Sequence, residues 1–192
     1  MINRANFYNL FKKHFGITKI NQSQVDGFEA IFNEWEKRQL SDIRWLAYML
    51  ATVWHETATK MQPIEEYGKG STRKYGKKIK HSGVSYIFPN KIYYGRGFVQ
   101  LTWFENYELM GRLLQIDLLK NPELALVMDV SVKILFEGMT KGASNFGDFT
   151  GKCLEMYFNE KTNDPLGARR IINGTDCANL ITNHYINFLK SL

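Results

Sequence analysis

Apolar side chains at helical spacing are the feature that most constrains the fold of this chain. The clearest stripe follows Ser41 and consists of Ile43, Leu46, Ala47, Leu50 and Trp54. A serine cap before such a stripe is typical of a helix that buries one face in a core. The longest apolar run, WLAYMLATVW at 45–54, has ten residues, whereas a membrane-spanning helix needs about 20. We therefore expect no stable membrane insertion.

Two more helices are expected before this stripe, one capped by Asn3 and one beginning at Ser23. Their apolar faces carry Phe7, Leu10 and Phe11 in the first helix, and Phe28, Ile31, Phe32 and Trp35 in the second. These aromatic side chains belong to a core more readily than to a ligand platform.

Three further helices are expected after the stripe. Asn121-Pro122 and Asp164-Pro165 each place a capping residue before a proline, which is typical of a helix start. The first of these helices runs toward Gly138, and the second ends at 173–174. The last helix has an apolar face that we expect to dock on the core, made of Ile181, Tyr185, Phe188 and Leu189.

Residues 67–97 have no helical period and are rich in Gly, Lys and Tyr. A connection of this length is typical of a functional or partly mobile segment, and β-hairpin pieces are expected around 86–88 and 93–101. The positive charge of the segment includes Lys69, Arg73, Lys74, Lys77, Lys78 and Lys80. A solvated basic loop is the alternative explanation. We expect one mainly α domain over residues 1–192, with a small β element.

The composition fits a packed protein that meets a polyanion. Hydrophobic residues make up 44% of the chain, which is enough for a sizeable core. The net charge of +6 favours an anionic partner, but no nucleic-acid-binding motif is present, so we expect no nucleic acid. Cys153 and Cys177 are expected to be free thiols. The start of the chain lacks the apolar stretch of a signal peptide, so synthesis in the cytoplasm is expected.

Two glutamates stand out as an acid and base pair. Glu56 ends the apolar stripe, where apolar neighbours and the negative end of the helix dipole both disfavour a charged carboxyl. Glu65 follows a turn at Pro63 in polar and basic surroundings that favour the ionised form. Carboxyls with such different environments are typical of general acid and base catalysis, although a salt-bridging surface is the alternative.

Other catalytic chemistries lack support in the sequence. His55-Glu56 is not followed by the second histidine that a zinc protease carries four residues after the first. No other ligand cluster appears, and no G-x-S-x-G nucleophile motif occurs. We expect neither a metal nor an organic cofactor.

Three blocks in order, WHET, YYGRGFVQLTWFENY and ARRIING, carry a resemblance to a known family. They resemble the family 19 glycoside hydrolases, which include chitinases and phage endolysins that cut peptidoglycan. The resemblance covers roughly residues 45–175. It implies a lysozyme-like α+β fold, with a helical bundle core and a small β-hairpin or loop element beside a cleft.

The resemblance also implies roles for particular residues. The proton donor falls on Glu56, the general base on Glu65, and the hydroxyl that holds the nucleophilic water on Thr102. Glu66 is adjacent to Glu65, and the choice between them stays open. The positions that resemble substrate contacts are His55, Gln100, Asn106 and Asn173, with Arg169 and Arg170 either facing the cleft or anchoring a helix. The segment after the donor departs from the family pattern, since Ala58, Thr59 and Lys60 stand where relatives often have glycine.

The expected function is that of a muramidase-type endolysin. The resemblance implies hydrolysis of a β-1,4 bond with inversion, and the basic loop favours an anionic glycan such as peptidoglycan. We expect a monomeric catalytic domain without a separate wall-binding domain, made in a bacterial cytoplasm and released to the cell wall with help from a holin. A chitinase is the first alternative, and a catalytically inactive glycan-binding lysis protein is the second.

Overall fold

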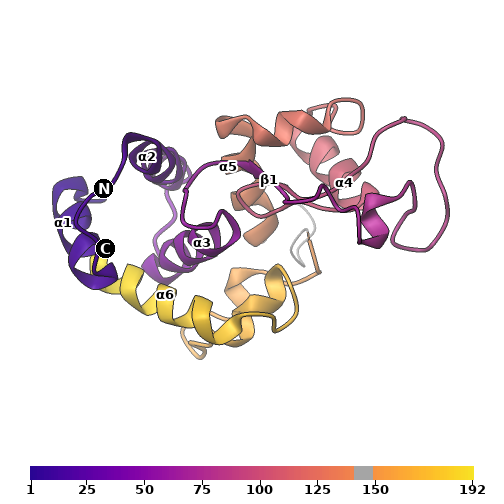
Figure 1. Ribbon diagram of the computed structural model, residues 1–192. Coiled ribbons are helices and arrows are strands. Elements are labelled where there is room, and N and C mark those ends of the chain that lie inside the picture. The colour runs from indigo at the N-terminus through magenta and orange to yellow at the C-terminus, as the bar shows by residue number, and fades with distance from the viewer. Residues whose placement is uncertain (141–148) are drawn as a thin grey trace.

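The computed structural model describes residues 1–140 and 149–192 (Figure 1). The described part contains six α-helices and one two-stranded antiparallel sheet. The helices are α1 (Arg4–Phe15), α2 (Gln22–Lys37), α3 (Ile43–Glu56), α4 (Phe104–Leu114), α5 (Met128–Met139) and α6 (Ala178–Ser191), and the strands are β1 (Ile64–Glu65) and β2 (Arg96–Gly97). The expected mainly α, lysozyme-like fold with a small β element is confirmed.

The core is built around α3. Its residues from Leu46 to Trp54 are all buried, and α6 runs alongside it with the C-terminus near α1 (Figure 1). Aromatic contacts join these helices: Phe11 stacks on Phe188 with centroids 5.5 Å apart and meets Trp54 edge-on at 5.3 Å. The apolar stripes expected from the sequence therefore meet in one cluster. Within the described residues, no helix has the length and hydropathy of a membrane span.

Two predicted helix starts are wrong by one or two residues. Helix α2 begins after Asn21, whose side chain accepts the backbone N–H of Gln24 at 2.8 Å in a reciprocal capping box, rather than at Ser23. Helix α3 is capped by Asp42, which accepts the N–H of Arg44 at 3.0 Å, rather than by Ser41. Asn and Asp carbonyl oxygens reach the second or third N–H of a helix as well as a serine hydroxyl does.

The two proline-marked starts lead to shorter helices than the sequence predicts. Pro122–Leu126 is a 3-10 turn that ends at Val127, whose extended backbone (φ −74°, ψ 129°) separates it from α5. The Asp164 carboxylate accepts the N–H of Gly167 at 2.8 Å, but only the 3-10 turn Gly167–Ile171 follows. A cap and a proline start a helical turn, and they do not determine whether it propagates.

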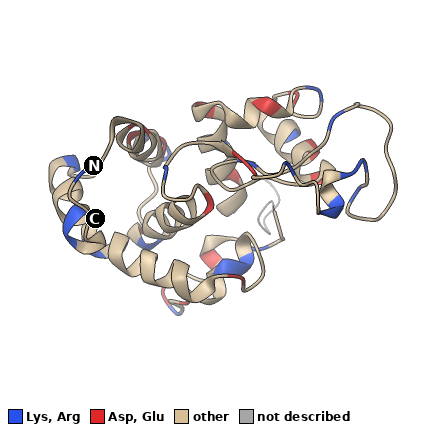
Figure 2. Ribbon diagram, in the orientation of Figure 1, with Lys and Arg blue, Asp and Glu red and all other residues tan. Residues whose placement is uncertain are grey.

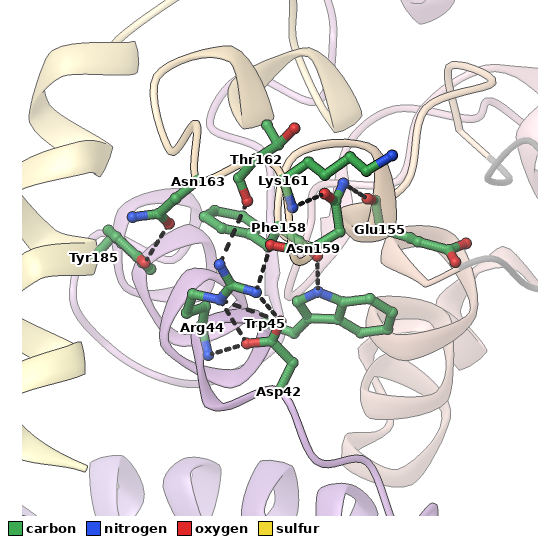
Figure 3. Close-up of polar contacts among 10 residues, drawn as sticks. All are labelled: Asp42, Arg44, Trp45, Glu155, Phe158, Asn159, Lys161, Thr162, Asn163 and Tyr185. Atoms are coloured by element: carbon green, nitrogen blue, oxygen red, sulfur yellow. Dashed lines mark hydrogen bonds and ion pairs between the residues drawn. The ribbon is translucent and has the colours of Figure 1, made fainter.

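Residues at the start of α3 bind the segment that precedes the 3-10 turn Gly167–Ile171 (Figure 3). The Asp42 carboxylate accepts a hydrogen bond from the Arg44 guanidinium at 2.6 Å, and the same guanidinium donates to the carbonyl of Asn159 at 3.1 Å. Next to it, the Trp45 indole donates to the carbonyl of Phe158 at 3.0 Å. The segment after residue 149 is thus fixed to the same helix that ends at Glu56.

The small sheet pairs segments that the sequence did not bring together. Ile64 lies opposite Gly97 and Glu65 opposite Arg96. The β character predicted at 93–101 is therefore present, but its partner is the segment after α3. No strand occurs at 86–88 in this described region, where Ile79 and Ser85 form a single bridge. Residues 67–92, called the arm below, extend from the body as a long loop (Figure 1).

The chain after α3 turns through left-handed backbone without any glycine. Ala58, Thr59 and Met61 have φ values of 48°, 65° and 52°. A β-branched residue such as Thr59 is disfavoured there, because its Cβ crowds the following carbonyl. Ala58 and Thr59 are two of the three positions where the sequence departs from the glycines of the family that it resembles, so the departure has a cost in stability.

We predict that Thr59→Gly raises the free energy of unfolding by about 1 kcal/mol, because glycine adopts this backbone without strain. The Thr59 side chain is exposed, so little packing is lost. Urea denaturation measures the change. Thr72→Gly is the control, since Thr72 is also exposed and does not have a positive φ. A gain in both variants, or in neither, contradicts the strain at residue 59.

Candidate active site

One cavity of about 870 Å³ collects the ends of several elements. The last residue of α3, the residue after β1, the segment from Val99 to Asn106 and the 172–173 pair all contribute to its wall. Five of the residues singled out from the sequence line it: Glu56, Gln100, Thr102, Asn106 and Asn173. The structure therefore brings together residues that are more than 110 positions apart in the chain.

Glu56 is fixed by a buried ion pair. Arg169 donates to its Oε1 at 2.6 Å, and the two side chains are only 14% and 2% exposed. The Arg169 Nε donates to the carbonyl of Asp176 at 2.8 Å, which fixes the guanidinium in turn. Arg169 anchors the glutamate and does not line the cavity. The sequence indicated the apolar neighbours and the helix end around Glu56, but it did not indicate this ion pair with Arg169.

Glu65, the last residue of β1, and Glu66, the residue after it, have different surroundings. Glu65 accepts the Tyr94 hydroxyl at 2.5 Å and pairs with Lys69 at 3.2 Å, and it does not line the cavity. The hydrogen bond from Tyr94 and the contact with Lys69 hold the pKa of the Glu65 carboxyl below its usual value of 4.5. The expectation of an ionised Glu65 is confirmed, but the carboxylate is engaged outside the cavity.

Glu66 is the neighbour that lines the cavity. Its Oε1 accepts the Tyr75 hydroxyl at 2.7 Å, and its Oε2 accepts the backbone N–H of Gly95 at 3.0 Å. A Cβ at Gly95 would lie 3.1 Å from the Cβ of Glu66 and 2.9 Å from the Gln100 amide oxygen. The glycine therefore lets the strand approach close enough to hold this carboxylate. Of the two glutamates that the sequence left open, Glu66 lines the same cavity as Glu56, and Glu65 does not.

Gln100 holds the sheet while it lines the cavity. Its amide nitrogen donates to the carbonyls of Ile64 and Gly97, at 3.0 and 3.1 Å. Thr102 follows Leu101, whose backbone forms a two-way bridge with Arg96. The tight backbone of this block therefore sets the positions of both polar side chains.

Tyr93, Tyr94 and Arg96 form a scaffold next to this block. The Arg96 guanidinium lies 3.6 Å from the centroid of the Tyr94 ring and donates to the Tyr107 hydroxyl at 3.0 Å. The Tyr93 hydroxyl donates to the carbonyl of Leu119 at 2.8 Å. These buried contacts connect β2 to the start of α4.

Two other predicted residues lie outside the cavity lining. His55 is half-buried at the end of α3, and Arg170 is exposed. The Arg170 carbonyl, rather than its guanidinium, contributes to the local structure by accepting the Thr150 hydroxyl at 2.8 Å. Substrate contact by either side chain stays a prediction. Among the described residues, no group of three His, Cys, Asp or Glu side chains has the arrangement of a metal site.

Lys and Arg gather on the arm (Figure 2). Carboxylates mark the end of α3 and the β1 segment, whereas Lys and Arg mark the arm. The arm, residues 67–92, contains seven Lys and Arg side chains and no Asp or Glu. The arm therefore presents positive charge beside an acidic site.

Sequence comparison assigns the chain to a family. A model of the family 19 glycoside hydrolases, described as chitinase class I, matches residues 36–142. This match covers more than half of the chain, which therefore belongs to family 19. The resemblance drawn from the three sequence blocks is confirmed.

Individual relatives match over shorter stretches. An endochitinase of Arabidopsis thaliana is 43% identical over 82 residues, which are 42% of this chain and 29% of the relative. A chitinase-like protein of Hevea brasiliensis that is named inactive is 56% identical over 36 residues, 19% of this chain and 12% of its own length. The chain thus spans less than a third of the length of either relative.

The fold has a close counterpart among solved structures. A bacterial family 19 chitinase superimposes with a TM-score of 0.62 at 23% identity, over 99% of this chain and 94% of the other. At this identity the likeness concerns the fold. It supports the lysozyme-like architecture that the sequence implied.

The contacts of Glu65 generate a pH-dependent prediction. Its pKa is lower in the folded than in the unfolded chain, so its stabilising effect is present above pH 4.5 and is lost as the pH falls through the folded-state pKa. We predict that Glu65→Gln lowers the free energy of unfolding at pH 7 by less than about 1 kcal/mol, because its side chain is 38% exposed and screened by water. The difference from the unmodified protein should be smaller at pH 3 than at pH 7. Urea denaturation at both pH values measures it, and an equal difference at the two values contradicts the assignment.

Proposed function

We propose that this chain is a glycosidase that hydrolyses β-1,4 bonds of an N-acetylated glycan with inversion, and that chitin is its substrate. The observation that carries this proposal is the presence of two carboxyls, Glu56 and Glu66, on the wall of one cavity that also holds Thr102. The names of its relatives support chitin over other polymers of this class. The proposal moves the base from Glu65, where the resemblance put it, to Glu66.

The two carboxyls divide the chemistry. Glu56 gives its proton to the leaving oxygen as the glycosidic bond breaks, and the Arg169 guanidinium at 2.6 Å stabilises the carboxylate that remains. Glu66 takes a proton from a water on the opposite face of the sugar, and the Thr102 hydroxyl helps to position that water. Inversion requires carboxyls roughly 6.5–9.5 Å apart, which leaves room for the water.

The hydrogen bonds of Glu66 are compatible with a base. Tyr75 and the Gly95 N–H each occupy one lone pair, one on each oxygen. A carboxylate has about four acceptor sites, so both oxygens can still accept from water. The two donors also fix the carboxylate in its orientation, which saves reorganisation during the reaction.

Peptidoglycan is the second substrate, and the charge of the arm favours it. Chitin carries no charge, whereas the stem peptides of peptidoglycan carry carboxylates that the basic side chains of residues 67–97 would attract. In that case the chain acts on the cell wall as an endolysin, as a monomer released from the cytoplasm through a holin. An inactive glycan-binding role is the remaining alternative, and it is supported by the name of the Hevea relative, an inactive chitinase-like protein.

We predict that Glu56→Gln and Glu66→Gln each lower kcat on chitin oligosaccharides by about 10² to 10⁴, because each removes one proton-transfer group. Glu65→Gln is the matched comparison, since it makes the same change one residue away, outside the cavity lining. We expect it to keep activity within about threefold. Full activity of Glu66→Gln together with inactive Glu65→Gln would return the base to Glu65.

The substrate and the stereochemistry have separate measurements. Release of reducing ends from colloidal chitin and from purified peptidoglycan compares the two polymers directly. Proton NMR of the first product gives its anomer, and we predict the anomer opposite to that of the cleaved bond. Retention of configuration contradicts the mechanism. Binding of both polymers without any hydrolysis supports the inactive alternative.

A further inference from the structure

The arm is joined to the cleft through a chain of side-chain contacts. The Tyr75 hydroxyl donates to Glu66, and the Tyr75 ring lies edge-on to Trp103 with centroids 5.7 Å apart. The His81 ring contacts the same indole at 4.8 Å, and the His81 backbone N–H donates to Oε1 of Glu105 at 2.9 Å. All five residues line the cavity. The arm therefore forms a wall of the cleft instead of a free loop.

Trp103 has a backbone conformation that few residues adopt. Its φ of 70° with ψ of 142° lies close to a region that is essentially restricted to glycine. Its N–H donates to the carbonyl of Tyr93 at 2.9 Å, which fixes the strained turn. Such strain persists where the surroundings over-determine it, and it is concentrated at ligand-binding positions. Here it presents a large aromatic ring to the cavity.

Glu105 has an acceptor that no donor satisfies. Within the described part of the chain, its Oε2 is buried and has no hydrogen-bond partner, whereas Oε1 is engaged by His81. A buried polar atom without a partner is unfavourable and calls for an explanation, such as a ligand that supplies the donor. Neither the acid and base pair nor Thr102 accounts for this carboxylate.

We propose that Trp103, His81 and Glu105 form a sugar-binding subsite on the arm side of the cleft. One N-acetylhexosamine unit lies against the indole and donates a hydroxyl or acetamido hydrogen to Oε2 of Glu105. An ionised carboxylate only accepts hydrogen bonds, so Oε2 of Glu105 fits the hydroxyl and acetamido donors of such a sugar. This inference rests on the proposed function, because it concerns the polymer that enters the same cleft.

The test measures binding without turnover. In the Glu56→Gln background, the affinity for the N-acetylglucosamine hexasaccharide is measured by calorimetry with and without Glu105→Gln. The amide oxygen of glutamine can still accept from His81, so the arm stays attached while the charged acceptor is lost. We expect the Kd to rise about tenfold or more, as for loss of a hydrogen bond to a charged group. In the active protein, KM should rise while kcat stays within about twofold.

Glu108→Gln is the matched control, because Glu108 is exposed on the same helix and does not line the cavity. It should leave the Kd unchanged, and the thermal midpoint of each variant checks the fold. An unchanged Kd for Glu105→Gln beside clear binding by the background protein overturns the subsite alone. No hexasaccharide binding by the background protein overturns both the subsite and the proposed substrate.

Discussion

The antiparallel pairing of Ile64–Glu65 with Arg96–Gly97 is the constraint on which the site depends. This pairing places two adjacent glutamates, one at the end of β1 and one just after it, in different environments. Glu65 turns to Tyr94 and Lys69, and Glu66 turns to the cavity. Gly95 then allows the close approach that lets a backbone N–H hold Glu66. The β1–β2 pairing thus leaves Glu65 in contacts outside the cavity and Glu66 on the cavity wall.

The position of Glu56 on the cavity wall depends on the aromatic core. Helix α3 is buried along most of its length, and its last residue is the glutamate that meets Arg169. An ion pair this buried is costly to break, since the remaining charge would have no partner. The Arg44 and Trp45 contacts hold part of the segment after residue 149, which contains Arg169, against the same helix (Figure 3). The packing that stabilises the core therefore also sets the position of Glu56.

Much of this arrangement was visible in the sequence, and the limits have physical causes. Apolar periodicity located the helices, because burial of a stripe depends on spacing alone. The sequence placed the two helix starts at Ser41 and Ser23 because several polar residues precede each stripe. Only the backbone geometry determines which of these residues caps the helix. A strand of two residues has no detectable alternation, which is why spacing could not distinguish Glu65 from Glu66.

Other features needed the structure because they join distant segments. The guanidinium that meets Glu56 comes from residue 169, and nothing local to ARRIING indicates which arginine is buried. The cluster of Glu105, Trp103 and His81 exists because the arm contacts the start of α4. Long-range contacts of this kind are set by tertiary packing, so a single sequence without relatives does not reveal them.

The most direct test of the divided carboxylates is a crystal structure of the Glu56→Gln variant with a bound N-acetylglucosamine oligosaccharide. The account predicts a glycosidic oxygen within hydrogen-bonding distance of residue 56, and a water held by Glu66 on the other face of that sugar. The carboxyl-to-amide separation should fall at roughly 6.5–9.5 Å. A sugar that contacts Glu65, or one bound away from both residues 56 and 66, would contradict it.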